Sequence, residues 1–111
     1  MIKENTKAIY LESPGTYTFE VIDIIKVMEI CKKYDLKSLI DNTWATAIYF
    51  NPFDFGVNVV IEAITKYISG HSDIMMGVVL ANNDDLVGSK GGLKTLAFML
   101  ALTIFSCLLE V

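Results

Sequence analysis

Four short apolar runs divide this chain of 111 residues, and their spacing constrains the fold more than any other feature. The runs lie at residues 8–11, 36–40, 57–64 and 75–80, and each has the length and composition of a buried strand. Between the first two runs, Asp23 can cap a helix that ends near Tyr34, with Lys32 and Lys33 in its last turn. A strand, a helix and a strand this apolar predict an α/β fold with a mainly parallel sheet covered on both faces.

Two residues of opposite charge follow the ends of predicted strands. Asp41 comes directly after the run at 36–40, and Lys66 follows the run at 57–64. In parallel sheets, ligands bind outside the carboxyl ends of the strands, so both side chains are expected at a ligand site. A lysine amine can form a Schiff base with the aldehyde of pyridoxal phosphate (PLP), and a carboxylate can keep the pyridine nitrogen protonated. This pair therefore predicts a PLP site with Lys66 as its catalytic residue.

The neighbours of Lys66 suggest how the phosphate of the cofactor is bound. The Thr65 hydroxyl and backbone N–H groups near Ala63 are placed to donate hydrogen bonds to it. We therefore expect Lys66, Asp41, Thr65 and Ala63 to bind the cofactor.

These residues also have purely structural interpretations. A lysine after an apolar strand usually reaches solvent, and Asp41 at the start of Asp-Asn-Thr can belong to a turn or a helix cap. His71 is expected to make structural hydrogen bonds. Trp44 and Tyr67 either line the pocket or, as is common for large aromatic side chains, belong to the core.

Several linked segments resemble one family in the same order. Residues 11–15 (LESPG), 41–46 (DNTWAT), 63–67 (AITKY) and 70–73 (GHSD) resemble the Cys/Met-metabolism family of PLP enzymes, from about Thr6 to Asn82. Gly15-Thr16 and Trp44 resemble the beta-lyase branch of that family. The resemblance implies part of the large PLP-binding domain of a fold-type I enzyme, incomplete in this chain.

The resemblance also implies an activity. It indicates a carbon–sulfur lyase of trans-sulfuration and methionine metabolism, which splits a small sulfur-containing amino acid by beta-elimination into a thiol, pyruvate and ammonia. Lys66 would move the alpha proton, with Asp41 supporting the electron sink and Thr65 anchoring the cofactor. Family members assemble as homo-oligomers.

The resemblance covers only part of a family member. Residues 1–82 are expected to be a central piece of the cofactor domain, and 83–111 a degraded remnant with an apolar tail. The family's phosphate loop, stacking ring and substrate-carboxylate arginine have no counterpart here, so we expect a fragment that is inactive alone. Two alternatives remain open, namely one piece of a split enzyme, or a non-catalytic interaction module that uses an exposed sheet edge.

Composition excludes several other classes of protein. Hydrophobic residues make up 53% of the chain, which is too many for a disordered segment. The net charge of −4 does not favour binding to the negatively charged backbone of nucleic acid. Cys31 and Cys107 lie far apart and His71 is the single histidine, so no metal site is expected. The charged N-terminus does not resemble a secretory signal, and the apolar tail is shorter than the ~20 residues of a membrane span. We therefore expect a cytoplasmic protein without a membrane partner.

Overall fold

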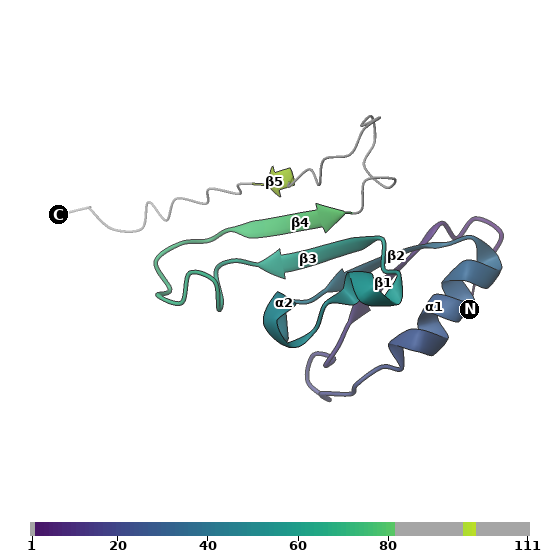
Figure 1. Ribbon diagram of the computed structural model, residues 1–111, viewed down its shortest axis with the longest axis horizontal. Coiled ribbons are helices and arrows are strands. Elements are labelled where there is room, and N and C mark those ends of the chain that lie inside the picture. The colour runs from purple at the N-terminus through teal and green to yellow at the C-terminus, as the bar shows by residue number, and fades with distance from the viewer. Residues whose placement is uncertain (1, 82–96, 100–111) are drawn as a thin grey trace.

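A computed structural model describes residues 2–81 and 97–99 of the chain. The elements in chain order are β1 (Ala8–Glu12), α1 (Ile24–Tyr34), β2 (Lys37–Asp41), α2 (Thr46–Tyr49), the 3-10 helix η1 (Pro52–Phe55), β3 (Val59–Ala63), β4 (Gly77–Ala81) and β5 (Ala97–Met99). The strands form one sheet in the order β1-β2-β3-β4-β5 (Figure 1). The four predicted strands are confirmed, with ends that differ by at most two residues. Apart from 97–99, the predicted remnant at 83–111 lies outside the described residues.

The sheet is mixed in direction. Strands β1, β2 and β3 pair in parallel, whereas β4 runs antiparallel to β3, and β5 runs antiparallel to β4. The predicted α/β class is confirmed, and so is the parallel arrangement of the first three strands. The reversal at β4 was not predicted, because strand direction depends on the connection. Residues 64–76 turn back beside β3 instead of crossing over the sheet as a parallel connection must.

Helix α1 begins and ends where the sequence predicts. The Asp23 side chain caps it by accepting a hydrogen bond from the Lys26 N–H at 3.2 Å. Asp35 closes the other end in the left-handed conformation, and its N–H donates to the carbonyl of Cys31. Lys32 and Lys33 lie in the last turn, where cations suit the helix dipole.

The core lies between α1 and one face of the sheet. Its buried residues are Leu11, Ile40, Val57 and Val60, and Ile24, Val27 and Met28 of α1 pack against them. Because side chains alternate along a strand, Tyr10, Leu39 and Ile61 lie on the opposite face. They remain partly exposed in the described part of the chain, so the predicted cover is present on one face only. That second face is called the open face below.

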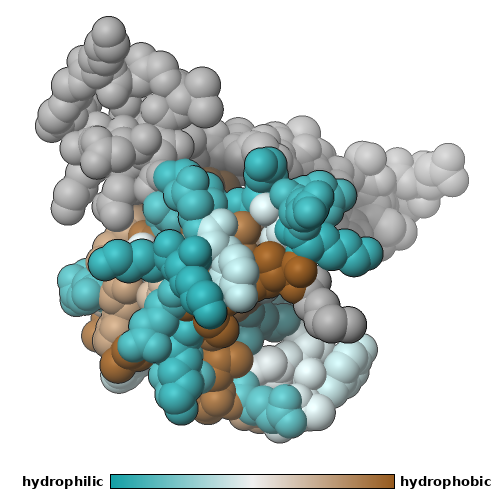
Figure 2. Space-filling model, turned by 90° about the vertical axis from the view of Figure 1, so that its right-hand side faces the viewer, coloured by the Kyte–Doolittle hydropathy of each residue, from teal (hydrophilic) through white to brown (hydrophobic). Residues whose placement is uncertain are grey.

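Hydrophobic side chains also reach the surface around α1. Figure 2 views the end of the molecule where α1 lies and shows hydrophobic residues at the surface between polar ones. Val21 and Ile25 are 77% and 58% exposed. Among the helices of the described residues, none has the length and hydropathy that a membrane span requires.

Candidate functional site

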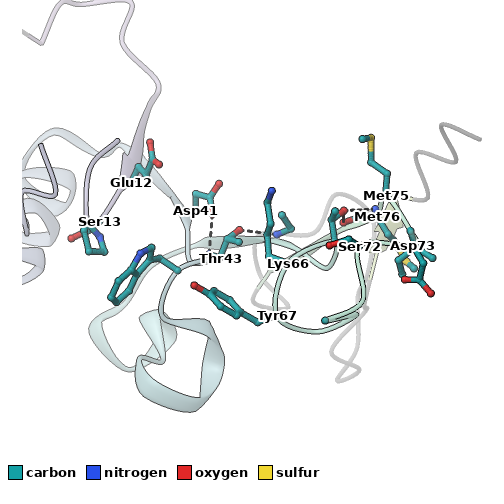
Figure 3. Close-up of a pocket in the computed structure, with 16 residues that line it drawn as sticks. Glu12, Ser13, Asp41, Thr43, Lys66, Tyr67, Ser72, Asp73, Met75 and Met76 are labelled. Atoms are coloured by element: carbon teal, nitrogen blue, oxygen red, sulfur yellow. Dashed lines mark hydrogen bonds between the residues drawn. The ribbon is translucent and has the colours of Figure 1, made fainter. Parts of the chain in front are cut away.

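The carboxyl ends of β1, β2 and β3 open onto one cavity of about 1350 Å³, together with the β3–β4 connection (Figure 3). The residues that line it are Glu12, Ser13, Pro14, Asp41, Thr43, Trp44, Ala63, Thr65, Lys66, Tyr67, Gly70, Ser72, Asp73, Ile74, Met75 and Met76. All four residues predicted to bind the cofactor are among them. The rule that ligands bind at the carboxyl ends of parallel strands thus located the cavity correctly.

Asp41 is the last residue of β2 and belongs to the open face. The Thr43 N–H donates to its Oδ1 atom at 2.9 Å, which forms a tight turn directly after the strand. The Thr43 hydroxyl accepts a hydrogen bond of 2.7 Å from the N–H of Ala63, the last residue of β3. Thr43 therefore joins the ends of β2 and β3 and limits the rotation of the Asp41 carboxylate.

Lys66 lies in the first turn after β3. Its backbone N–H donates to the carbonyl of Ala63 at 3.1 Å, and its own carbonyl accepts from Gly70 at 2.9 Å. The side chains of Lys66 and Asp41 project to the same side of the strand ends (Figure 3). Within the described residues the Lys66 amine makes no ion pair.

Thr65 has a structural role that the sequence did not reveal. Its hydroxyl donates to the carbonyl of Met76 at 3.1 Å and accepts from the Met76 N–H at 2.8 Å. The Thr65 N–H donates to the same carbonyl, so this residue closes the β3–β4 connection. The hydroxyl must give up its bond to Met76 before it can donate to a phosphate.

The N–H of Ala63 is engaged as well, because it donates to Thr43. The roles of Thr65 and Ala63 in phosphate binding therefore stay predictions.

The two aromatic residues line the cavity rather than the core. Trp44 and Tyr67 are 59% and 64% exposed, so the core interpretation is wrong for both. His71 makes a structural hydrogen bond, as predicted, since its Nδ1 lies 2.6 Å from the carbonyl oxygen of Ser69. Among the described residues, no cluster of three potential metal ligands is found.

The cavity residues that were not predicted as site residues include Glu12, Ser13 and Thr43. Glu12 lies directly opposite Asp41 in the β1–β2 register, and the Thr16 hydroxyl donates to its carboxylate at 2.7 Å. The Ser13 hydroxyl accepts from the Ile22 N–H at 3.2 Å and so holds the loop after β1. A signal for the turn at Thr43 was present, since an aspartate side chain commonly accepts a hydrogen bond from the backbone N–H two residues later.

Tyr10 adds a further group beside Asp41. The pKa of the Tyr10 phenol is raised, first by burial. The negative charges of Asp41 and Glu12 and a hydrogen bond to the Asp41 side chain raise it further. The phenol hydroxyl is the donor of that hydrogen bond, because an ionised carboxylate can only accept.

Comparison with known proteins assigns the chain to a family. The family model of the Cys/Met metabolism PLP-dependent enzymes matches residues 1–99. A cystathionine beta-lyase of Lactococcus lactis subsp. cremoris (strain MG1363) is 40% identical over 92 residues, which are 83% of this chain and 24% of that protein. An L-alanine/L-glutamate racemase of Wolbachia pipientis wMel is 40% identical over 84 residues, 76% of this chain and 21% of that protein.

A solved structure agrees with the sequence comparison. The crystal structure of cystathionine gamma-lyase from Lactobacillus plantarum, complexed with L-serine, superposes with a TM-score of 0.71 and 37% identity. The superposition covers 75% of this chain and 22% of that one. The chain thus spans about a quarter of the length of the curated relatives that it matches.

Proposed function

This chain belongs to the Cys/Met metabolism family of PLP-dependent enzymes, and we propose that its cavity is the PLP site of a carbon–sulfur lyase of the cystathionine beta-lyase kind. The observation that carries the proposal is that Lys66 and Asp41 line one cavity at the strand ends and project to the same side. An amine and a carboxylate are the groups that suit an aldehyde and a pyridine nitrogen. Residues 1–82 then form the middle of the cofactor domain.

Each residue has a defined part in this proposal. Lys66 holds the cofactor through its amine and afterwards carries a proton to and from the alpha carbon of the substrate. Asp41, restrained by Thr43, keeps a negative charge at the wall of the cavity. When bound, PLP withdraws electrons from the bonds to the alpha carbon of an amino acid, which is the chemistry that a beta-elimination needs.

The two donors proposed for the cofactor phosphate already have hydrogen-bond partners. Thr65 and Ala63 donate to it only if their present bonds to Met76 and Thr43 are exchanged. Exchange of the Ala63 bond removes the donor of the Thr43 hydroxyl, and exchange of the Thr65 bond leaves the Met76 carbonyl with the Thr65 N–H as its donor. We therefore propose that further donors from outside this chain hold the phosphate.

The substrate is proposed to be a small sulfur-containing amino acid, because the family acts on such compounds. All nine cationic residues of the chain are lysines, so a guanidinium that clamps the substrate carboxylate must come from elsewhere. With about a quarter of the length of its relatives, the chain is expected to be inactive alone. Positioning of the substrate contributes much of the rate of an enzyme, and the chain lacks the groups for it.

Two alternatives remain beside this proposal. In the first, the chain is one piece of a split enzyme, and separate polypeptides supply the phosphate loop and the remaining domain. In the second, it is a non-catalytic interaction module, which would fold stably without PLP. A homo-oligomeric state and a cytoplasmic location remain predictions that belong to the first proposal.

The racemase relative leaves the chemistry at the alpha carbon open. Elimination and racemisation both begin with movement of the alpha proton, so Lys66 has the same first task in either reaction. Gly15-Thr16 and Trp44, which resemble the beta-lyase branch, favour elimination.

A PLP titration tests the proposal. The purified chain is titrated with PLP, and the visible absorbance of the bound cofactor is followed in wild type, Lys66→Ala and Asp41→Asn. We expect a saturable band that disappears in Lys66→Ala and an affinity reduced by about tenfold in Asp41→Asn, because the charged partner is lost.

Lys3→Ala is the matched control, since Lys3 is exposed and does not line the cavity. A band that is equal in wild type and Lys66→Ala would refute the cofactor site.

A further inference from the structure

Tyr10 and Asp41 are diagonal neighbours on the open face of the sheet. The register of β1 and β2 places Tyr10 opposite Leu39 and Glu12 opposite Asp41. Tyr10 therefore lies one diagonal step from Asp41, a separation that an aromatic side chain can span. Tyr10 itself is outside the group of cavity-lining residues, so it approaches Asp41 from beside the cavity.

Two donors act on the Asp41 carboxylate from different directions. The Thr43 N–H binds Oδ1 at 2.9 Å from the chain that follows β2, and the Tyr10 hydroxyl donates from the neighbouring strand. A carboxylate offers about four acceptor positions, so two donors leave room for a third from a ligand. Two bonds from separate elements also fix the plane of the carboxylate more firmly than the turn alone.

The orientation of the Asp41 carboxylate decides what it can bind in the cavity. Asp41 lines the cavity at the end of β2, so a fixed carboxylate plane fixes the direction in which its free acceptor positions point. A donor on the neighbouring strand adds a second point of attachment to the one that the turn at Thr43 supplies.

We propose that Tyr10 is a positioning residue for Asp41 and that its hydroxyl holds the carboxylate in a fixed orientation at the cavity wall. This inference rests on the proposed function, because the orientation matters only if Asp41 serves PLP. Phenylalanine at position 10 would keep the ring and its contacts but lose the donor. The contact between Tyr10 and Asp41 and its effect on PLP affinity can therefore be tested separately.

The contact is tested without cofactor. With tyrosine labelled at the ring Cζ by ¹³C, the ionisation of each phenol is followed by NMR against pH, and Tyr10→Phe identifies the Tyr10 signal. We expect the phenol of Tyr10 to have a pKa above the ordinary value of a tyrosine, and Asp41→Asn to lower that pKa. An ionisation of Tyr10 that is unchanged in Asp41→Asn would overturn the contact.

The consequence is tested by PLP binding. Tyr10→Phe is expected to weaken PLP affinity roughly three- to tenfold, the range for losing one hydrogen bond to a charged group. Tyr17→Phe, the matched control, should bind PLP as wild type does. Equal affinity in Tyr10→Phe and wild type would overturn the positioning role and leave the proposed function intact.

Two further outcomes are also decisive. If wild type takes up no PLP, the proposed function fails and the positioning role fails with it, while the phenol titration still decides the contact. If Tyr10→Phe loses the circular dichroism of wild type, Tyr10 is needed for folding, and the response of its phenol to Asp41→Asn alone decides the inference.

Discussion

At the scale of single residues, Thr43 connects the fold to the site. Its hydroxyl accepts from the N–H at the end of β3, and its N–H donates to Asp41 at the end of β2. Thr43→Val keeps the shape of the side chain but leaves the Ala63 N–H without that acceptor. We expect the free energy of unfolding to fall by about 1–3 kcal/mol, measured by urea denaturation.

Thr43→Ser is the control for this prediction, because serine keeps the hydroxyl. It should lose less than half as much stability as Thr43→Val. A Thr43→Val protein as stable as wild type would show that the bond between Thr43 and Ala63 does not hold the strand ends together.

Asn42 and Glu62 form a buried polar pair on the covered face of the sheet. They are 1% and 5% exposed, and the Asn42 amide donates to a Glu62 carboxylate oxygen at 3.1 Å and to the carbonyl of Phe50 at 3.0 Å. Asn42→Ala would leave both acceptors without this donor, so we expect a loss of about 2–4 kcal/mol in the free energy of unfolding.

A double-mutant cycle with Glu62→Leu tests whether the two residues are coupled. The double variant should lose at least about 1 kcal/mol less than the sum of the single variants, because the buried carboxylate is then absent. Additive losses would contradict the pairing.

The site residues show what a sequence can and cannot predict at this scale. Lys66 and Asp41 were predictable because each follows an apolar strand, and the ends of parallel strands share one edge of the sheet. The bonds of Thr65 were not predictable, since they depend on Met76, which the β3–β4 connection brings beside it. For Trp44 and Tyr67, hydrophobicity alone did not distinguish a cavity wall from a core.

At the scale of elements, α1 depends on its cap. The Asp23 pKa is lowered, first by the side-chain hydrogen bond to Lys26, whose ammonium lies 2.8 Å from the carboxylate, and then by the backbone bond from Lys26. A lowered pKa in the folded state contributes stability above the unfolded pKa of about 3.9 that is lost as the pH falls below it. Asp23→Ala should therefore lower the urea midpoint at pH 7 and have a smaller effect near pH 2.

Asp23→Asn is the control for the cap. Asparagine caps helices about as well as aspartate but does not ionise, so its urea midpoint at pH 7 should lie between those of Asp23→Ala and wild type. Equal midpoints of Asp23→Ala and wild type at pH 7 would show that the cap contributes nothing measurable to stability.

The strands and helix α1 were largely predictable, whereas their three-dimensional arrangement was less so. Apolar runs and cap residues define local structure, and the predicted strands lie within two residues of β1 to β4. The antiparallel direction of β4 follows from the contacts of Thr65 with Met76, which no local pattern records. Likewise, an apolar run predicts a strand that can be buried on both faces. It does not predict whether helices of the same chain pack on both faces.

At the scale of the whole molecule, residues 2–81 and 97–99 form a sheet that has an open face and an edge strand, β1, without a second partner among these residues. Edge strands without cover are templates for association between chains, and a lysine on them is an effective block. We expect the purified chain to associate with rising concentration in sedimentation velocity. Ala8→Lys should shift the onset of association to a concentration several-fold higher.

Asn5→Lys adds the same charge at an exposed position before β1 and serves as the control. If both variants shift the onset equally, net charge rather than the edge controls association.

The central claim is that Lys66 is the residue that holds PLP, and covalent trapping tests it most directly. The chain is incubated with PLP and reduced with borohydride, and the modified lysines are identified by peptide mass spectrometry. Of the nine lysines in the chain, Lys66 should carry the label at substoichiometric PLP, and Lys66→Ala should lose that specific label. A label spread over the exposed lysines and unchanged in total by Lys66→Ala would contradict the claim.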